Sequence, residues 1–384
     1  MENIMWNPLV SIIIPVFNGS NFLHEAIESA LAQTYKNIEI LVINDGSNDE
    51  GETERIALSF GNKIRYFSKE NGGVATALNL GIENMRGEYF SWLSHDDLYM
   101  KNKISYQINI LSELDDKLTI LACGFKIIDE NGLCIHEFDY LKGPFSHQMN
   151  IPLFALFLNA IHGCTLLIHK NHFCRTGLFD PNKVTTQDYV LWFKMWRGQN
   201  FLFHDGLLVL AREHRKRSSK VNFELHTKEC DELWFDMVKS LSEQEMIQLK
   251  GSVVDFYLWR LEIINNNVYS MPLLKTASYL RQQLINCKDV SYTLKIDLLI
   301  EELKNDINIK DYEKLFKTYE KLYNEFEYLK NEFDNQKINF EKLLYERNNI
   351  LSSKDYRIGH KIITLFCFIE NKIRTIFNKI NDLY

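Results

Sequence analysis

The first half of the chain alternates short apolar runs with stretches whose apolar residues recur at helical spacing. Residues 9–14 are predominantly apolar up to Pro15, as expected of a strand buried on both faces. Residues 23–31 follow with apolar positions three and four apart, which indicates a helix. By the same criteria we expect further strands at 38–43, 64–67, 89–93, 120–124, 165–168 and 207–212, helices at 74–84, 101–114 and 186–197, and a hairpin at 126–138. This order predicts an α/β fold.

The second half of the chain has no strand signals after about Glu224, and it is predicted to be helical. Residues 226–310 are expected to form a helical extension, in which Ser242 and Glu245 have the spacing of a capping box. Residues 311–351 carry Tyr, Phe and Leu at a seven-residue repeat, which predicts a coiled coil and therefore a homo-oligomer. A long helical hairpin and a single long helix packed on the body of the protein are the alternatives.

The last part of the chain, residues 352–384, places isoleucines on one helical face and is locally basic. A basic amphipathic helix suits an anionic membrane surface. A helix that packs on a protein partner is the alternative. Together these patterns predict four parts, at 1–225, 226–310, 311–351 and 352–384.

Composition and charge narrow the classes of function. The 384 residues carry a net charge of −7, which does not support a nucleic-acid binder. The seven cysteines include no C-x-x-C pair, so we expect reduced thiols rather than a disulfide or zinc framework. We find neither an apolar run long enough to span a membrane nor a signal-peptide pattern. These features predict a cytoplasmic protein, associated with the inner face of the membrane if the terminal helix binds lipid.

Carboxylates follow the expected strand ends. Asp45 comes directly after the second strand, and Asp96 and Asp97 come after the fourth. In a parallel sheet, the crevice beyond the carboxyl ends of the strands binds ligands, so these acids are expected to meet there. Adjacent carboxylates repel each other unless a cation is bound or one of them is protonated. Their oxygens suit Mg²⁺ or Mn²⁺ together with substrate phosphates. The alternative is that Asp96 and Asp97 cap the helix expected from about residue 101.

Two common nucleotide-binding classes lack their motifs in this chain. The first strand is followed by Pro15-Val16-Phe17-Asn18-Gly19 and not by G-x-G-x-x-G, and no G-x-x-x-x-G-K-[ST] is present. Both a dinucleotide-dependent oxidoreductase and a P-loop protein are therefore disfavoured.

Segments 8–49 and 70–97 contain IIIPVFN, VINDGSND, ENGGVATALN and WLSHDD, and they strongly resemble glycosyltransferase family 2. The resemblance is collinear over roughly residues 8–220 and implies an inverting GT-A fold, a Rossmann-like mixed sheet, within residues 1–225. It implies a metal site at Asp97 and Asp96, with Asp96 nearer the ribose and pyrophosphate. It also implies a nucleotide-sugar site formed by Pro15, Val16, Phe17, Asn18, Asp45, Asn71, Gly73, Ala77 and Asn79.

The resemblance continues in HGCTLLIHKNHF and GLFDPNKVTTQDYVLWFKM, which are similar to the family's acceptor-side segment. Asp188 falls where the family carries its catalytic base, which takes the proton of the acceptor hydroxyl. A first-turn acid of the helix at 186–197 is the alternative. His162 is expected to border the acceptor pocket, and Gln187 stands where the family commonly has Glu. His214 resembles a family histidine that reaches the metal or the pyrophosphate, although a structural histidine is the alternative for both His162 and His214.

The resemblance implies transfer of one sugar, with inversion, from a nucleoside-diphosphate donor, most often a UDP-sugar. The acceptor would be a hydroxyl of a glycan, lipid-linked or protein-linked acceptor in cell-surface polysaccharide or glycoconjugate synthesis. The chain lacks the Gln-x-x-Arg-Trp segment of processive synthases, which favours single transfer. Ser94 stands where many relatives have a further Asp. The alternative is a degenerate, non-catalytic transferase domain that acts as a coiled-coil scaffold.

Overall fold

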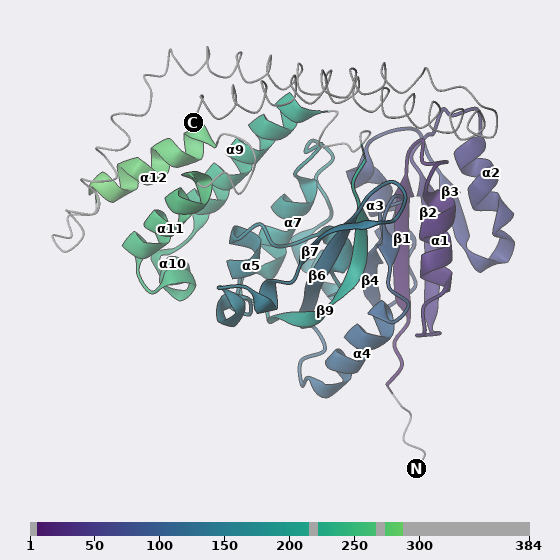
Figure 1. Ribbon diagram of the computed structural model, residues 1–384, viewed down its shortest axis with the longest axis horizontal. Coiled ribbons are helices and arrows are strands. Elements are labelled where there is room, and N and C mark those ends of the chain that lie inside the picture. Colours follow the sequence, from purple (N-terminus) through teal and green to yellow (C-terminus); the bar gives the residue numbers. More distant parts are fainter. Residues whose placement is uncertain (1–5, 215–221, 266–272, 287–384) are drawn as a thin grey trace, which may run out of the picture. The chain divides into compact units, whose positions relative to one another are not determined.

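A computed structural model describes residues 6–214, 222–265 and 273–286 of the protein. These residues belong to the first of two compact units, which spans Met1–Val290 (Figure 1). The expected coiled coil at 311–351 and the expected terminal helix at 352–384 lie outside the described residues. The described part of the helical extension ends at Asn286.

The first sheet has five strands in the order β3-β2-β1-β4-β8 and positions most of the predicted acids. Its strands are β1 (Val10–Val16), β2 (Ile38–Asn44), β3 (Arg65–Ser68), β4 (Tyr89–Trp92) and β8 (Ile168–His169). The first four are parallel, and β8 pairs antiparallel with β4, so the sheet is mixed as predicted. The carboxyl ends of β1, β2 and β4 therefore meet at one edge.

Strand β1 runs through Pro15, where the sequence pattern predicts its end. Pro15 lies in register with Ile43, and the strand continues to Val16. Proline costs little at this point because it lies one residue from the end of the strand, where few ladder hydrogen bonds remain to be made. All seven residues of β1 are buried, as predicted for the centre of a parallel sheet.

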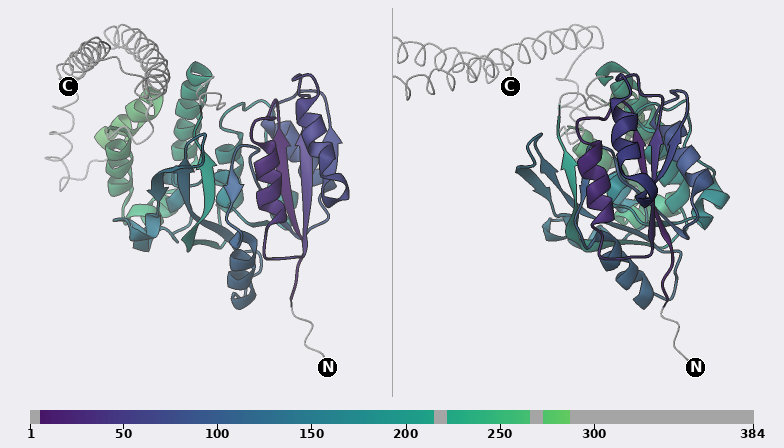
Figure 2. Two further views of the ribbon diagram at one scale, coloured as in Figure 1. Left: turned by 45° about the vertical axis from the view of Figure 1, so that its right-hand side comes forward. Right: turned by 90° about the vertical axis from the view of Figure 1, so that its right-hand side faces the viewer.

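The helices of the first sheet are α1 (Leu23–Leu31), α2 (Glu52–Ser59) and α3 (Val74–Asn84). Figures 1 and 2 show α1 and α2 beside the part of the sheet formed by β1 to β3. Helix α3 packs on β1 and β2. The prediction missed α2, whose apolar residues are few: only Thr53 and Ala57 are buried.

A second sheet has four strands in the order β5-β9-β6-β7. They are β5 (Leu98–Tyr99), β9 (Phe201–Arg212), β6 (Ile120–Ile128) and β7 (Cys134–Phe138). The predicted hairpin is confirmed, because β6 and β7 pair antiparallel across Gly132. The separate segments expected at 120–124 and 126–128 form the single strand β6, and β9 begins earlier than expected. The strand expected at 165–168 is reduced to β8, preceded by the 3-10 turn η4 (Gly163–Thr165).

The remaining helices lie between the later strands and in the extension after β9. Helix α4 (Lys103–Glu113) and helix α7 (Gln187–Trp196) lie where the pattern predicts them, whereas the short helices α5 (Phe154–Phe157) and α6 (Asn171–Thr176) were not predicted. The extension contains α9 (Phe223–Ser240), α10 (Glu243–Lys250), α11 (Val253–Asn265) and α12 (Leu274–Asn286). The predicted capping box is confirmed at Ser242 and Glu245. Helix α12 packs against both α9 and α11. Among the described residues, no helix is both long enough and apolar enough to cross a bilayer.

Candidate active site

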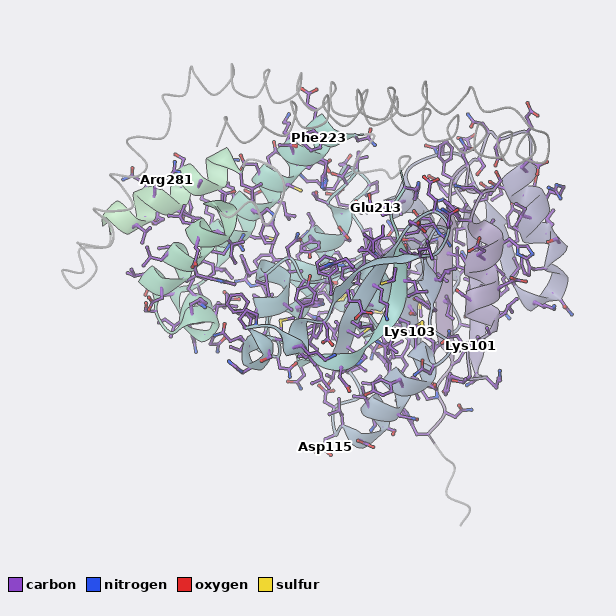
Figure 3. All side chains as sticks on the ribbon, in the orientation of Figure 1. Lys101, Lys103, Asp115, Glu213, Phe223 and Arg281 are labelled. Carbon is purple, nitrogen blue, oxygen red and sulfur yellow. The ribbon has the colours of Figure 1, made fainter. Side chains whose placement is uncertain are left out.

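A cavity of about 930 Å³ opens at the carboxyl ends of β1, β2 and β4. Residues of the first sheet, of α3, α7 and α9, and of the connecting loops line it, and Figure 3 shows the side chains on the surrounding fold. Fourteen of the fifteen residues named from the sequence reach the cavity, namely Pro15, Val16, Phe17, Asn18, Asp45, Asn71, Gly73, Ala77, Asp96, Asp97, His162, Gln187, Asp188 and His214. Asn79 does not, because its side-chain amide bridges to the backbone N–H and C=O of Phe179.

Asp45 lies at the end of the cavity formed by β2 and the start of α3. Its carboxylate accepts hydrogen bonds from the backbone N–H groups of Gly72 at 3.1 Å and Gly73 at 2.7 Å. Lys69 Nζ lies 2.6 Å from Asp45 Oδ1. Gly73 has a φ of +86°, a conformation that side chains disfavour, and this brings its N–H toward the carboxylate. The Asp45 side chain is thus held in one position by the main chain.

The loop after β1 is tied to the loop after β2. The Asn18 side-chain amide donates to Asn48 Oδ1 at 2.7 Å, and Asn18 Oδ1 accepts from the Asn48 backbone N–H at 2.8 Å. The backbone N–H of Asn18 donates to Ser47 Oγ. These reciprocal hydrogen bonds keep the two loops that border the cavity at a set separation.

Asp96 forms a close pair with His214, a contact that the sequence did not predict. The distance from His214 Nε2 to Asp96 Oδ2 is 2.8 Å. Burial by itself would raise the pKa of Asp96, but the hydrogen bond from His214 and the nearby His95 lower it below its usual range. Asp96 is therefore a carboxylate at any physiological pH.

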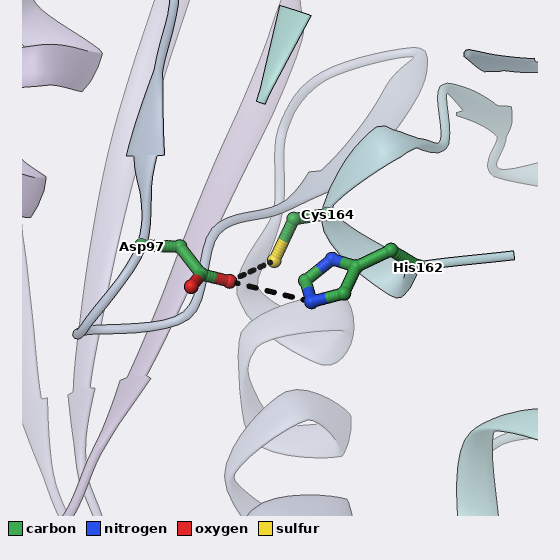
Figure 4. A group of neighbouring side chains, drawn as sticks. All are labelled: Asp97, His162 and Cys164. Atoms are coloured by element: carbon green, nitrogen blue, oxygen red, sulfur yellow. Dashed lines mark hydrogen bonds and ion pairs between the residues drawn. The ribbon is translucent and has the colours of Figure 1, made fainter. Parts of the chain in front are cut away.

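Asp97 meets His162 and Cys164, as Figure 4 shows. Cys164 Sγ donates a hydrogen bond to Asp97 Oδ2 at 3.2 Å, and His162 Nε2 lies 3.7 Å from the same oxygen. The three ligand atoms lie within 4.8 Å of one another, so these residues could hold a metal ion. The interpretation of Asp97 as a helix cap is wrong, because α4 begins after Asn102 with no side-chain cap. Instead, Asp97 Oδ1 accepts the backbone N–H of Arg212.

The donor set fits a divalent cation. Asp97 offers a hard carboxylate oxygen, which suits Mg²⁺ or Mn²⁺. His162 offers a ring nitrogen, which suits a transition metal such as Mn²⁺ better than Mg²⁺. Cys164 adds a softer sulfur donor, and sequence reasoning missed it. The available signal was that Cys164 follows His162 by two residues, but a single histidine–cysteine pair at this spacing is too common to predict a metal site.

Asp188 lines the cavity from the start of α7. It is in the first turn of the helix, where its carboxylate accepts the backbone N–H of Tyr189 at 2.8 Å. Burial raises the pKa of Asp188 to about 6. A carboxylate with such a pKa can accept a proton near neutral pH more effectively than an ordinary aspartate. The first-turn position is compatible with this chemistry.

Helix α9 also lines the cavity, which the sequence did not lead us to expect. His226, Cys230, Leu233 and Trp234 face it. These positions are spaced at i, i+4, i+7 and i+8 and so lie on one helical face. Burial, with a contribution from Asp188, raises the pKa of the Cys230 thiol to about 12, so this side of α9 lies close to Asp188.

Carboxylates predominate among the described residues that line the cavity. The described lining residues include four carboxylates, Asp45, Asp96, Asp97 and Asp188, but neither lysine nor arginine. A diphosphate ligand would bring further negative charge. A divalent cation at Asp97 would offset that charge, because ions at close range interact strongly in a partly buried site.

A mixed α/β sheet with acid-bearing loops at its carboxyl edge defines a class of proteins that bind a nucleotide-linked ligand in the crevice beyond the strands. Comparisons with known proteins make the class specific. Residues 11–173 match the family model described as glycosyl transferase family 2. An uncharacterized glycosyltransferase of Rickettsia typhi is 50% identical over 256 residues, which are 67% of this chain and 80% of the relative. The chain belongs to glycosyltransferase family 2.

Other relatives are longer. An uncharacterized glycosyltransferase of Rickettsia conorii is 46% identical over 309 residues, 78% of this chain and 50% of the relative. The chain thus spans about half the length of several curated relatives that it matches. Among solved structures, residues 1–349 of Staphylococcus aureus TarS in complex with UDP-GlcNAc align with a TM-score of 0.52 at 16% identity. That alignment covers 72% of this chain and 88% of TarS 1–349. This likeness confirms the predicted GT-A-like α/β fold.

Proposed function

We propose that the protein is a metal-dependent, inverting glycosyltransferase that moves one sugar from a UDP-sugar to an acceptor hydroxyl. The main support is the convergence of Asp45, Asp97 and Asp188, from three distant segments, on one cavity. The solved structure of TarS with UDP-GlcNAc supports a nucleotide-sugar donor of this kind.

On this proposal, the donor lies between the loops after β1 and β2 and the pair of acids after β4. Asp45 accepts a hydrogen bond from an N–H of the nucleotide base. The backbone N–H groups of Gly72 and Gly73 hold the Asp45 carboxylate in place even when no nucleotide sugar is bound. Asp96 binds the ribose and pyrophosphate side. Asp97 and His162 would hold the Mg²⁺ or Mn²⁺ ion, and His214 would act through Asp96. When bound, the metal offsets the charge that grows on the departing diphosphate.

The acceptor would enter from the side of α7. Inversion requires the acceptor hydroxyl to attack the anomeric carbon from the face opposite the nucleotide. As the C–O bond to the new sugar forms and the bond to the diphosphate breaks, Asp188 takes the hydroxyl proton. Gln187 adjoins this position and is 5% exposed. His162 lies between the metal side and the acceptor side.

We propose that the acceptor is a glycan or a lipid-linked or protein-linked saccharide of the cell surface. The proposal includes a catalytic domain at 1–225, a helical extension at 226–310, an oligomer formed through the predicted coiled coil at 311–351, and membrane contact through 352–384. It also includes a location of the protein in the cytoplasm, at the inner face of the membrane. Removal of residues 352–384 should weaken binding to anionic liposomes and leave UDP affinity unchanged, and unchanged liposome binding would contradict membrane contact.

A panel of nucleotide sugars with Mn²⁺ or Mg²⁺ tests the donor and the metal together. A donor at 100 times its Kd stabilises the fold by about 2.7 kcal/mol, which a thermal-shift assay detects. In the presence of metal, slow transfer of the sugar from this donor to water should release UDP, and EDTA should abolish the release. Failure of every donor to bind or to release UDP would favour the scaffold alternative instead.

A further inference from the structure

The side of the cavity that carries Asp188 is assembled by two segments that lie far apart in the sequence. Residues 184–186 form the loop that leads into α7, and Asp188 follows two residues later. Glu229 projects from α9 onto this loop. The Glu229 side chain is 5% exposed, so its charge lies almost wholly inside the protein. A buried carboxylate is costly unless hydrogen bonds satisfy it.

Four hydrogen bonds satisfy Glu229, and all of them come from this one loop. The backbone N–H groups of Val184 and Thr185 donate to its carboxylate at 3.0 and 2.8 Å. The hydroxyls of Thr185 and Thr186 donate at 2.8 and 3.4 Å. Burial alone would raise the pKa of Glu229, but these hydrogen bonds lower it, so the group is ionised and its hydrogen bonds are charge-assisted.

The start of α7 depends on these contacts. Thr186 occupies the N-cap position but makes no capping hydrogen bond to the helix. Its hydroxyl donates to Glu229 instead. Since a threonine at this position normally caps its own helix, the orientation of the first turn here is set by α9. Asp188 lies in that first turn.

A second contact links the same two helices. The rings of Tyr189 and Trp234 pack edge to face with centroids 5.8 Å apart. The Tyr189 hydroxyl donates in turn to the backbone C=O of Ile161, at the edge of the cavity. Residues on both sides of Asp188 are therefore attached to α9, one by charge-assisted hydrogen bonds and the other by aromatic packing.

We propose that Glu229 is a positioning residue of the transfer reaction, and that α9 completes the acceptor side of the active site. Glu229 holds residues 184–186 so that Asp188 faces the acceptor hydroxyl. The α9 face with His226, Cys230 and Leu233 forms the adjoining wall. This inference rests on the proposed transferase function, and it assigns acceptor-side geometry to a helix outside the segment 11–173 that matches the family model.

Two variants test the positioning role. The assay is the release of UDP from the nucleotide sugar that the thermal-shift panel identifies as the donor. Glu229→Ala removes all four hydrogen bonds, and Thr185→Val removes only one hydroxyl donor. Glu224→Ala is the matched control, because Glu224 is an exposed glutamate in the first turn of the same helix. Three quantities are measured for each: the Kd for the donor with Mn²⁺, the rate of UDP release from pH 4 to 9, and the melting temperature.

We expect the Kd of the donor to stay within about twofold in every variant, because the donor-side loops are untouched. Misplacement of Asp188 in Glu229→Ala should lower the rate about 100-fold. Thr185→Val should lower it about tenfold, the effect of one hydrogen bond to a charged group. The acid limb of the pH profile should move from near pH 6 toward about pH 4, the ordinary range of aspartate, because the loosened turn hydrates Asp188.

The possible results separate this inference from the proposed function. An active wild type with a folded Glu229→Ala variant of unchanged rate and unchanged acid limb would overturn the positioning role alone. Equal losses of donor affinity, rate and melting temperature with an unmoved acid limb would also overturn it, since that pattern marks a purely structural residue. If Glu229→Ala does not fold, an unaltered rate and pH profile in Thr185→Val overturns it. A wild type that releases no UDP from any donor overturns the transferase function and this inference with it.

Discussion

The two sides of the cavity are built in different ways. On the donor side, Asp45 is held by consecutive backbone N–H groups of Gly72 and Gly73, at the end of a parallel strand. On the acceptor side, the loop before Asp188 is held by one side chain, Glu229, from a later helix. Support by backbone groups survives most substitutions, whereas support by a single side chain is lost when that one residue is substituted. If the proposed function holds, the acceptor side can therefore be altered by few substitutions, without rebuilding the sheet that carries the donor side.

The electrostatics of the two sides also differ. His214 and His95 lower the pKa of Asp96 against the effect of burial, whereas burial raises the pKa of Asp188 to about 6. A carboxylate that stays ionised suits charge neutralisation beside a metal and a diphosphate. A carboxylate poised near neutral pH suits proton transfer. The environments of these two aspartates thus fit the two different chemical roles that we propose for them.

The largest expected effect is on the metal side. Asp97→Ala should lower metal-dependent UDP release by more than about 10³-fold, because the metal would lose its main oxygen ligand. The donor should also lose its dependence on Mn²⁺ for binding, as measured by calorimetry. Asp115→Asn, an exposed acid outside the cavity lining (Figure 3), serves as the control and should behave as wild type. Normal activity of Asp97→Ala would break the assignment of the metal to this side.

Asp188→Asn should lower the rate about 10²- to 10³-fold, because the amide cannot take the acceptor proton. The Kd of the donor should not change, in contrast with Asp97→Ala. In the wild type, the rate should fall as pH drops below about 6, where Asp188 becomes protonated. A parallel loss of donor affinity in Asp188→Asn would show that the two sides are not separate.

Asp45→Asn should weaken donor affinity about 10- to 100-fold, the range for hydrogen bonds to a charged group. The substitution removes the charge paired with Lys69 and presents an N–H₂ group toward the Gly72 and Gly73 amides. The rate at saturating donor should change little, because Asp45 is remote from the sugar. An effect on the rate alone, with normal affinity, would contradict its placement at the base.

Cys164→Ser should change activity with Mg²⁺ or Mn²⁺ by less than about threefold, because the serine hydroxyl can still donate to Asp97. Sulfur favours thiophilic ions, so Cd²⁺ should inhibit the wild type more strongly than the variant. Competition assays with Cd²⁺ against Mn²⁺ measure this difference. Equal inhibition would place Cys164 outside the coordination sphere.

The smallest effect concerns stability. The folded-state pKa of Asp188 is raised, so the ionised side chain destabilises the fold, and this cost grows as pH rises through about 6. Asp188→Asn should therefore melt a few degrees higher than wild type at pH 8. Below about pH 4, where Asp188 is protonated in both folded and unfolded chains, the difference should vanish. Thermal unfolding at the two pH values checks the sign; a variant that melts lower at pH 8 would contradict the burial of Asp188.

Much of the donor side was predictable because its residues follow strand ends. Once residues 10–16, 38–44 and 89–92 form neighbouring parallel strands, Asp45, Asp96 and Asp97 must meet at one edge. The capping box at Ser242 was predictable for a similar reason, since it depends on residues three apart. Both predictions depend on local patterns that need no knowledge of distant contacts.

The contacts that support the site residues were not predictable in this way. Cys164 reaches Asp97 because η4 packs beside β4, and Glu229 reaches Thr185 because α9 folds back on α7. Helix α2 and strand β5 were missed because their apolar patterns are too short. In each case the decisive contact joins segments whose separation in sequence carries no periodic signal.

The amino-acid sequence by itself determined the order of strands and helices, the family, and the acids beyond the strand ends, because hydrophobic periodicity and short motifs are local properties. Only the tertiary structure decided that Asp96 pairs with His214, that Asp97 pairs with Cys164, and that Glu229 supports the loop before Asp188. The physical reason is that burial, pKa and hydrogen-bond partners depend on which distant side chains exclude water from the same space.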